Sequence, residues 1–238
     1  MRCITMVRFE MMPQRTGVLW LVSLTALIAC GRSAGAETAK PESSAPMAAA
    51  TGVTRADGGK GPREHRLIPL RPMSGDVEIL YGDPDAAGEP FVMRIRELPG
   101  TIVPPHSHPV DEHITILKGT WYFGLGEEFD RARLEELKPG SYAFAPKGAS
   151  MFGYAPEEVI VQVHGIGPFE IRWHGGLRTL DDPDAKTAFR FARGQQIGSP
   201  RGTGRIVEGY GSGRIIQYEI ERAEGGRFMV NEDEIRTR

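Results

Sequence analysis

The run Pro104-Pro105-His106-Ser107-His108-Pro109-Val110-Asp111-Glu112-His113 holds three of the six histidines of the chain. Residues two apart in a β-strand point the same way, so His106 and His108 can present two imidazoles to one point. Glu112 follows after a short turn and can add a carboxylate oxygen from the next strand. Two histidines and one carboxylate form a known ligand set for Fe(II), and they also suit Mn and Zn. We therefore predict a divalent-metal site here, against the alternative of a solvated histidine-rich loop.

The residues around this run keep fixed separations. In the first motif, five residues separate Gly100 from His106-Ser107-His108, three more separate His108 from Glu112, and six separate Glu112 from Gly119. In the second motif, five residues separate Gly140 from Pro146, and one residue separates Pro146 from Gly148. Two motifs in this order and separation resemble those of the cupin superfamily, over about residues 76–175. The resemblance implies a jelly-roll-like β-barrel with the metal inside, held by His106, His108 and Glu112. It also implies a small-molecule ligand and, because cupins often pair through their outer strands, a homodimer.

The second motif then departs from the cupin pattern. Its third histidine is replaced by Met151, and the asparagine expected four residues later is Ala155. Three alternatives stay open. A three-ligand site with an open position survives. Another donor completes the site, either Met151 itself, which suits copper, or His164 if its face of the strand lines the barrel. In the third alternative the site is weak or empty, and the barrel binds its ligand without metal. In the alternatives with a metal, we expect Fe, Mn, Zn or Cu.

The rest of the body predicts an all-β protein. Short apolar runs alternate with turn residues, which is typical of antiparallel barrels and sandwiches. Only Arg131–Leu137 has helical potential. The expected strands of the barrel are Val77–Tyr81, Phe91–Leu98, His113–Leu117, Thr120–Leu125, Tyr142–Ala145, Val159–His164 and Phe169–Trp173. After an acidic loop at residues 181–184, short Gly-punctuated strands resemble a small SH3-like β-barrel; the alternative is that they extend the main sheet.

The N-terminus predicts an export signal and an anchor. The uncharged apolar run Gly17–Ala29 is too short for a membrane span but fits a signal-peptide core. It ends in Leu27-Ile28-Ala29-Cys30, which resembles the lipobox of bacterial lipoproteins and implies lipidation of Cys30. Cleavage after Ala36 would instead give a soluble secreted protein. We expect a signal peptide at 1–29, a flexible tether at 30–63, a cupin barrel at 64–178 and the SH3-like domain at 185–238.

Composition and charge narrow the function. The formal net charge of −2 gives no reason to expect a nucleic-acid partner, and we expect membrane contact through the lipid anchor only. Both cysteines, Cys3 and Cys30, precede the body, so the barrel has no thiol ligand or nucleophile. We expect a cell-envelope protein on the periplasmic side. It is either a metal-dependent enzyme of dioxygenase or isomerase type, by resemblance, or a non-catalytic protein that binds a small ligand or a metal. A structural envelope protein is a third hypothesis.

Overall fold

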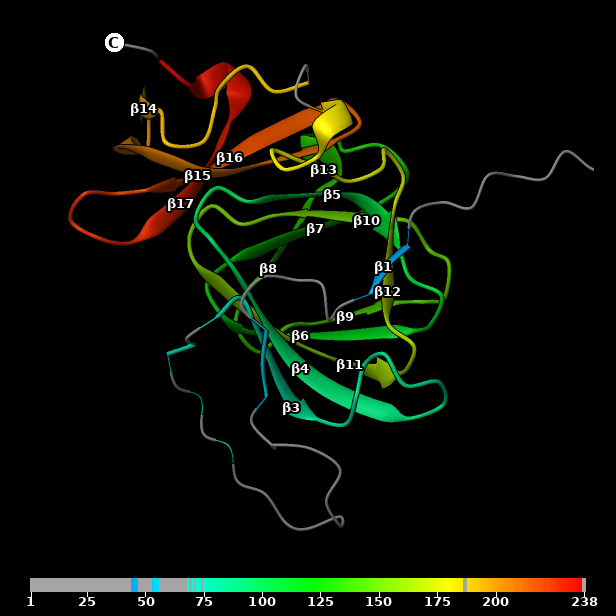
Figure 1. The fold of residues 1–238 in the computed structure, drawn as a ribbon. Coiled ribbons are helices and arrows are strands. Elements are labelled where there is room, and N and C mark those ends of the chain that lie inside the picture. The colour runs from blue at the N-terminus through cyan, green and yellow to red at the C-terminus, as the bar shows by residue number, and fades with distance from the viewer. Residues whose placement is uncertain are drawn as a thin grey trace, which may run out of the picture. The chain divides into compact units, whose positions relative to one another are not determined.

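The computed structural model describes residues 44–46, 53–55, 68, 70, 72–73, 75–185 and 188–236 (Figure 1). The predicted signal peptide, Cys30 and most of the predicted tether lie outside these residues. No helix in the described ranges is long and apolar enough to cross a membrane.

Two six-stranded sheets form the barrel and face each other as layers (Figure 1). The first has the order β1-β12-β5-β10-β7-β8, and the second has the order β2-β3-β4-β11-β6-β9. The strands are β1 (Ser44–Pro46), β2 (Val53–Arg55), β3 (Val77–Tyr81), β4 (Pro90–Glu97), β5 (Ile102–Ser107), β6 (Glu112–Lys118), β7 (Trp121–Leu125), β8 (Glu135–Leu137), β9 (Tyr142–Ala145), β10 (Met151–Tyr154), β11 (Val159–Ile166) and β12 (Glu170–Trp173). From β4 to β12 successive strands alternate between the sheets, apart from the β7–β8 hairpin. This is a double-stranded β-helix, so the predicted all-β, cupin-type fold is confirmed.

The alternation of side chains along each strand places the core between the sheets. In β11, Val159, Val161 and Val163 are buried, whereas Gln162 and His164 on the opposite face are only partly buried; Ile160, also on that face, is buried. The same alternation buries every second residue of β6. The buried core of the barrel consists of Val77, Ile79, Phe91, Met93, Ile114, Ile116, Trp121, Ala155, Val159, Val161, Val163 and Phe169. Strand faces predicted from period-two patterning are therefore the faces observed.

β5 was not among the expected strands, and it ends at Ser107, one residue before His108. Two further features of the barrel differ from the predicted elements. The segment expected to have helical potential forms one 3-10 turn, Arg131–Arg133, and then pairs as β8 with β7. β10 was not predicted, because its four residues, Met-Phe-Gly-Tyr, show no polar–apolar alternation. Its Gly153 has a packing reason, since a Cβ there would overlap the Trp121 ring.

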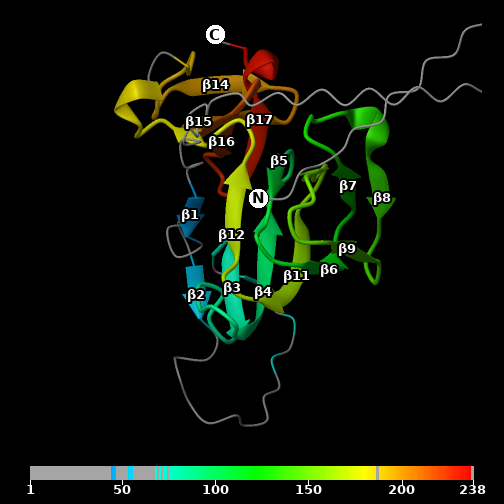
Figure 2. The same ribbon diagram turned by 90° about the vertical axis from the view of Figure 1, so that its right-hand side faces the viewer.

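Two short strands fall inside the segment predicted as tether. β1 pairs with β12, and β2 pairs in parallel with β3, so each lies at the edge of one sheet (Figure 2). An edge strand is held by backbone hydrogen bonds, which composition does not reveal. A low content of bulky apolar residues therefore did not exclude strand pairing here.

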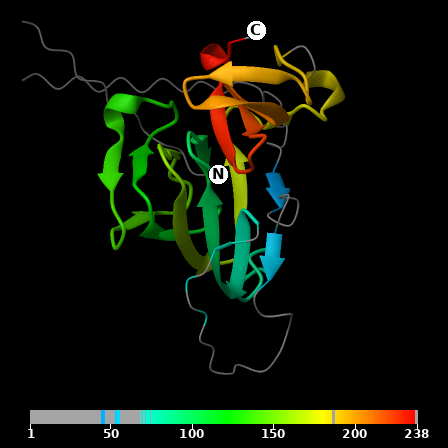
Figure 3. The same ribbon diagram turned by 90° about the vertical axis from the view of Figure 1, so that its left-hand side faces the viewer.

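The C-terminal residues form a third, five-stranded sheet and do not extend either barrel sheet (Figure 3). Its strands are β13 (Arg178–Thr179), β14 (Gln196–Ser199), β15 (Gly202–Ser212), β16 (Ile215–Glu221) and β17 (Arg227–Asn231). The order is β13-β15-β16-β17, with β14 also pairing with β15. It has its own core around Tyr218, Ile220 and Phe228. Its SH3-like character and the boundaries 64–178 and 185–238 stay predictions.

Hydrogen bonds join this sheet to one end of the barrel. The carboxamide of Gln217 accepts from the Ile102 N–H at 2.9 Å and donates to the Gly100 carbonyl at 3.0 Å. The Met229 N–H donates to the Pro99 carbonyl at 2.8 Å. These bonds are made at or just before the first residue of β5. The C-terminal sheet therefore holds in place the start of the strand that has His106 near its other end.

Candidate metal centre

The three predicted ligands come together where the chain crosses from one sheet to the other. His106 lies near the end of β5, His108 just after it, and Glu112 begins β6. Their exposed fractions are 8%, 3% and 5%. All three side chains are therefore enclosed in the protein, which excludes the solvated histidine-rich loop.

Residues of the second predicted motif form hydrogen bonds with the turn between His108 and Glu112. Gly148, at φ +77°, donates its N–H to the His108 carbonyl at 2.9 Å. The neighbouring Lys147 N–H donates to the Asp111 carboxylate at 2.7 Å. The left-handed backbone at Gly148 favours glycine. The spacing of the two motifs thus reflects a direct contact between them.

Both histidines are fixed in the same tautomer. The Nδ1 of His106 lies 2.8 Å from the Pro104 carbonyl oxygen, and that of His108 lies 2.7 Å from the Glu170 carbonyl oxygen. A carbonyl oxygen only accepts hydrogen bonds, so each Nδ1 must carry the hydrogen and donate it. In the neutral ring Nε2 then keeps a free lone pair, the arrangement usual for metal-ligating histidines.

His108 and Glu112 face each other through two atoms with lone pairs. His108 Nε2 is 3.5 Å from Glu112 Oε2, and within the described part of the chain neither atom has a hydrogen-bond partner. Burial raises the pKa of Glu112 to about 8. Burial also lowers the pKa of His106 to about 4 and, together with the nearby His106, that of His108 to about 3. Both imidazoles are therefore neutral at pH 7, and the gap between His108 and Glu112 calls for a proton or a cation.

Aromatic rings enclose the two imidazoles. The His108 ring stacks on Phe169 with centroids 4.1 Å apart, and the His106 ring lies 5.1 Å from that of Trp173. The two imidazole centroids are 5.0 Å apart, edge to face. These walls hold the imidazoles in place and exclude water from one side of the cluster.

The donor chemistry fits a divalent cation, although the atoms are not gathered around one point. In the described ranges, no group of three or more His, Cys, Asp and Glu side chains is arranged to hold a metal ion. The cluster still offers two Nε2 lone pairs and one carboxyl group, and two of these atoms, His108 Nε2 and Glu112 Oε2, are buried without a partner. Such unpaired buried atoms are costly unless something fills the gap.

The two substitute ligands lie in different places. Met151 stands directly opposite His106 in the β10–β5 register and is 3% exposed, so its side chain shares the face of His106. His164 does not join the cluster, because its neighbours Val163 and Val161 take the core face of β11. It pairs instead with His113 on the outer face. His113 also points away from the cluster, as strand alternation predicts.

A pocket of about 410 Å³ lies between β7, β8 and β9. It is lined by Phe123, Gly124, Leu125, Arg133, Glu135, Leu137, Tyr142 and Ala143. Leu125 stands opposite Met151, which stands opposite His106. Leu125 on the pocket wall is therefore two strands away from His106, although none of the three predicted ligands lines the pocket.

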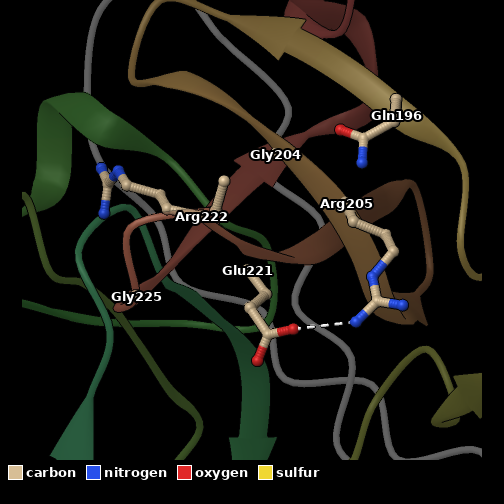
Figure 4. Close-up of a pocket in the computed structure, with 7 residues that line it drawn as sticks. Gln196, Gly204, Arg205, Glu221, Arg222 and Gly225 are labelled. Carbon is tan, nitrogen blue, oxygen red and sulfur yellow. Dashed lines mark hydrogen bonds and ion pairs between the residues drawn. The ribbon is translucent and has the colours of Figure 1, made fainter.

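A second pocket, of about 390 Å³, lies on the C-terminal sheet (Figure 4). Arg205 and Glu221 form an ion pair across it at 3.0 Å. Arg222 places its guanidinium over the Phe228 ring, 4.3 Å from the centroid. The charges of this pocket are thus engaged within the protein, and no imidazole lines it.

Comparison with known proteins adds a likeness to solved structures. No protein-family model and no curated protein matches the sequence. The DMSP lyase DddQ from Ruegeria pomeroyi is 22% identical over 34% of this chain and 40% of its own, with a TM-score of 0.30. A conserved protein with a double-stranded β-helix domain from Klebsiella pneumoniae is 21% identical over 43% of this chain and 90% of its own (TM-score 0.34). Salicylate 1,2-dioxygenase from Pseudoaminobacter salicylatoxidans is 13% identical over 39% and 27% (TM-score 0.33).

The likeness is one of fold alone. This chain spans about two fifths of the lyase and a smaller share of the dioxygenase. The activities of those proteins therefore do not transfer to it.

Sequence reasoning missed the aromatic enclosure and the pocket. Phe169 and Trp173 both occur in a predicted strand, four residues apart, which puts them on one face. That signal places them together but does not identify the histidines as their neighbours. The pocket beside Leu125 depends on the pairing of β8 with β7, in a segment for which the sequence predicted helical potential.

Proposed function

We propose that this protein binds one divalent metal ion in the barrel through His106, His108 and Glu112, and acts on a small organic molecule next to it. The observation that carries the proposal is the pair of buried, facing atoms, His108 Nε2 and Glu112 Oε2, 3.5 Å apart. A bound divalent ion would act as a Lewis acid with positions left open for a small molecule.

The residues around the cluster have defined roles in this proposal. The carbonyls of Pro104 and Glu170 hold both imidazoles with Nε2 free. Phe169 and Trp173 keep the rings oriented and exclude water. Because they are already fixed, the imidazoles lose little conformational freedom when a cation binds.

The pocket between β7, β8 and β9 receives the small molecule. Phe123, Leu125, Leu137 and Ala143 supply apolar contact, and Arg133 and Glu135 bring charge to its rim. An apolar lining with a few polar groups is the usual composition of a ligand site. We infer a ligand with an apolar body and at least one polar group.

A non-catalytic binding protein is the second candidate. Met151, opposite His106, is a weak ligand for hard ions, which favours a barrel that binds a small molecule without a tightly held catalytic metal. In this case the barrel captures the small molecule and releases it unchanged.

Metal loading and turnover of the untagged full chain would test both candidates. Metal-free protein is loaded in turn with Fe²⁺, Mn²⁺, Zn²⁺ and Cu²⁺, and each form is incubated with a panel of small organic acids while products and dioxygen uptake are followed. Metal-dependent turnover that disappears in His106→Ala supports the enzyme. Metal-dependent binding without turnover supports the second candidate. No metal uptake by the folded protein contradicts both.

We further propose that Cys30 carries a lipid that anchors the protein on the periplasmic side of the cell envelope, and that two copies pair. Incorporation of labelled palmitate that is lost in Cys30→Ala supports the anchor. Equal incorporation by that variant, or none by the unchanged protein, contradicts it and favours a soluble secreted form. Light scattering of the protein without its first 30 residues tests the pairing, and a monomer mass contradicts it.

A further inference from the structure

Two histidines form a second group of potential metal ligands, on the outer face of the barrel. His113 on β6 and His164 on β11 stand directly opposite each other in the antiparallel register. Their flanking residues Ile114 and Val163 point into the core, so both imidazoles project outward. Both rings are partly exposed, and an ion in solution can therefore reach them.

The two rings are already side by side. Their centroids are 4.8 Å apart and their planes differ by 9°. Directly opposite residues of antiparallel strands have Cβ atoms about 4.5–5.5 Å apart, which lets two imidazoles bind one ion. Parallel rings must turn so that both nitrogens point to the ion. This turn is cheap, because χ2 of histidine is a broad torsion.

One of the imidazoles has a partner of the kind that metal-ligating histidines use. The Nδ1 of His113 lies 2.7 Å from the Tyr142 hydroxyl oxygen. When Nδ1–H donates to this oxygen, Nε2 is left with a lone pair for a metal. The ring of Phe144, 5.1 Å from that of His113, packs against its other side. His164 makes no hydrogen bond to another side chain in the described ranges, so both of its nitrogens are available.

We propose that His113 and His164 form a second, solvent-facing site for a late first-row divalent ion, separate from the interior cluster. Imidazole nitrogen suits Cu²⁺, Ni²⁺ and Zn²⁺, and divalent copper binds such ligands most tightly. With two protein ligands and no carboxylate, the site binds less tightly than a complete four-ligand site and leaves positions for water or a second molecule. The proposal does not depend on the function of the interior cluster.

Copper titration of the untagged chain tests the site, in a His108→Ala background that removes an interior ligand. We expect one Cu²⁺ to bind, with an electron paramagnetic resonance spectrum that shows two nitrogen donors. Because the second imidazole acts as an intramolecular ligand, His164→Asn should weaken binding by about tenfold or more. His113→Asn should do the same.

The controls separate this site from the interior one. If His108→Ala fails to fold, the same comparison is made in the unchanged protein. There, the copper that a soluble chelator can reach should show nitrogen ligands in its spectrum, and His164→Asn should remove this signal. Copper affinity and spectrum unchanged by both His164→Asn and His113→Asn would overturn the proposal. Failure of the interior cluster to bind metal would leave this result untouched, because neither variant alters that cluster.

Discussion

His106 on β5 stands directly opposite Met151 on β10, and both side chains are buried. Opposite residues lie about 4.5–5.5 Å apart at Cβ, so the side chain at 151 can reach an ion beside His106. The residue at this position therefore decides whether the site has three good ligands or four.

Met151→His should tighten metal binding. An imidazole is a better ligand than a thioether for Zn²⁺, Mn²⁺ and Fe²⁺, and we expect about a tenfold or greater gain in Zn²⁺ affinity by calorimetry. Met151→Leu is the matched control, since it keeps the apolar volume and removes the sulfur. A folded Met151→His protein that binds Zn²⁺ no more tightly would show that position 151 does not reach the ion. Loss of Cu²⁺ affinity in Met151→Leu would identify the thioether as a ligand.

Glu112→Gln should separate folding from metal binding. The amide can donate to His108 Nε2 and removes a buried carboxyl whose pKa burial raises to about 8. We therefore expect the metal-free Tm to stay the same or rise, while the Tm increase on adding metal disappears. Scanning calorimetry with and without Zn²⁺ measures both. Glu127→Gln, an exposed carboxylate, should keep the metal response, and a full response in Glu112→Gln would exclude Glu112 as a ligand.

Gln217→Leu should destabilise the protein strongly. It leaves the Ile102 N–H and the Gly100 carbonyl without their partner, and each unsatisfied buried group costs about 1–3 kcal/mol. We expect a loss of roughly 2–4 kcal/mol in the free energy of unfolding, measured by urea denaturation. Gln196→Leu, exposed on the same sheet, should change it by less than about 0.5 kcal/mol. Equal effects of the two substitutions would mean that Gln217 does not join the C-terminal sheet to the barrel.

Glu97→Gln should change how stability depends on pH. Burial, with a smaller contribution from the nearby Asp76, raises the pKa of Glu97 from its ordinary value of 4.5 to about 7. The folded state therefore favours the protonated form, and its contribution to stability is complete below about pH 4.5 and is lost as pH rises through 7. Between pH 5 and 8 the variant should gain up to about 3 kcal/mol relative to the unchanged protein. Glu89→Gln, an exposed control, should gain nothing, and parallel pH curves for all three proteins would contradict a raised pKa of Glu97.

The motif spacing predicted the fold class and the residues of the cluster because both depend on local backbone geometry. Alternation in strands such as β11 identifies its core face, and the separation of His106, His108 and Glu112 fits one strand, a turn and the next strand. Gly148 fits the pattern because its N–H meets the His108 carbonyl.

The remaining features depend on pairings between distant segments, which one sequence does not show. His164 and His113 are 51 positions apart along the chain, and only the register of β11 with β6 brings their rings together. The role of Gln217 likewise arises from contact with Ile102, 115 residues away. β1 could not be predicted for the same reason, because it pairs with β12, which is distant in the sequence.

Anomalous diffraction from crystals of the untagged protein, soaked with Zn²⁺ and measured on both sides of the zinc absorption edge, tests the central claim most directly. We predict an anomalous peak inside the barrel, bonded to His106 Nε2, His108 Nε2 and the Glu112 carboxylate. A well-ordered barrel with no anomalous peak among these three side chains at saturating Zn²⁺ would contradict the account, whatever metal binds on its outer face.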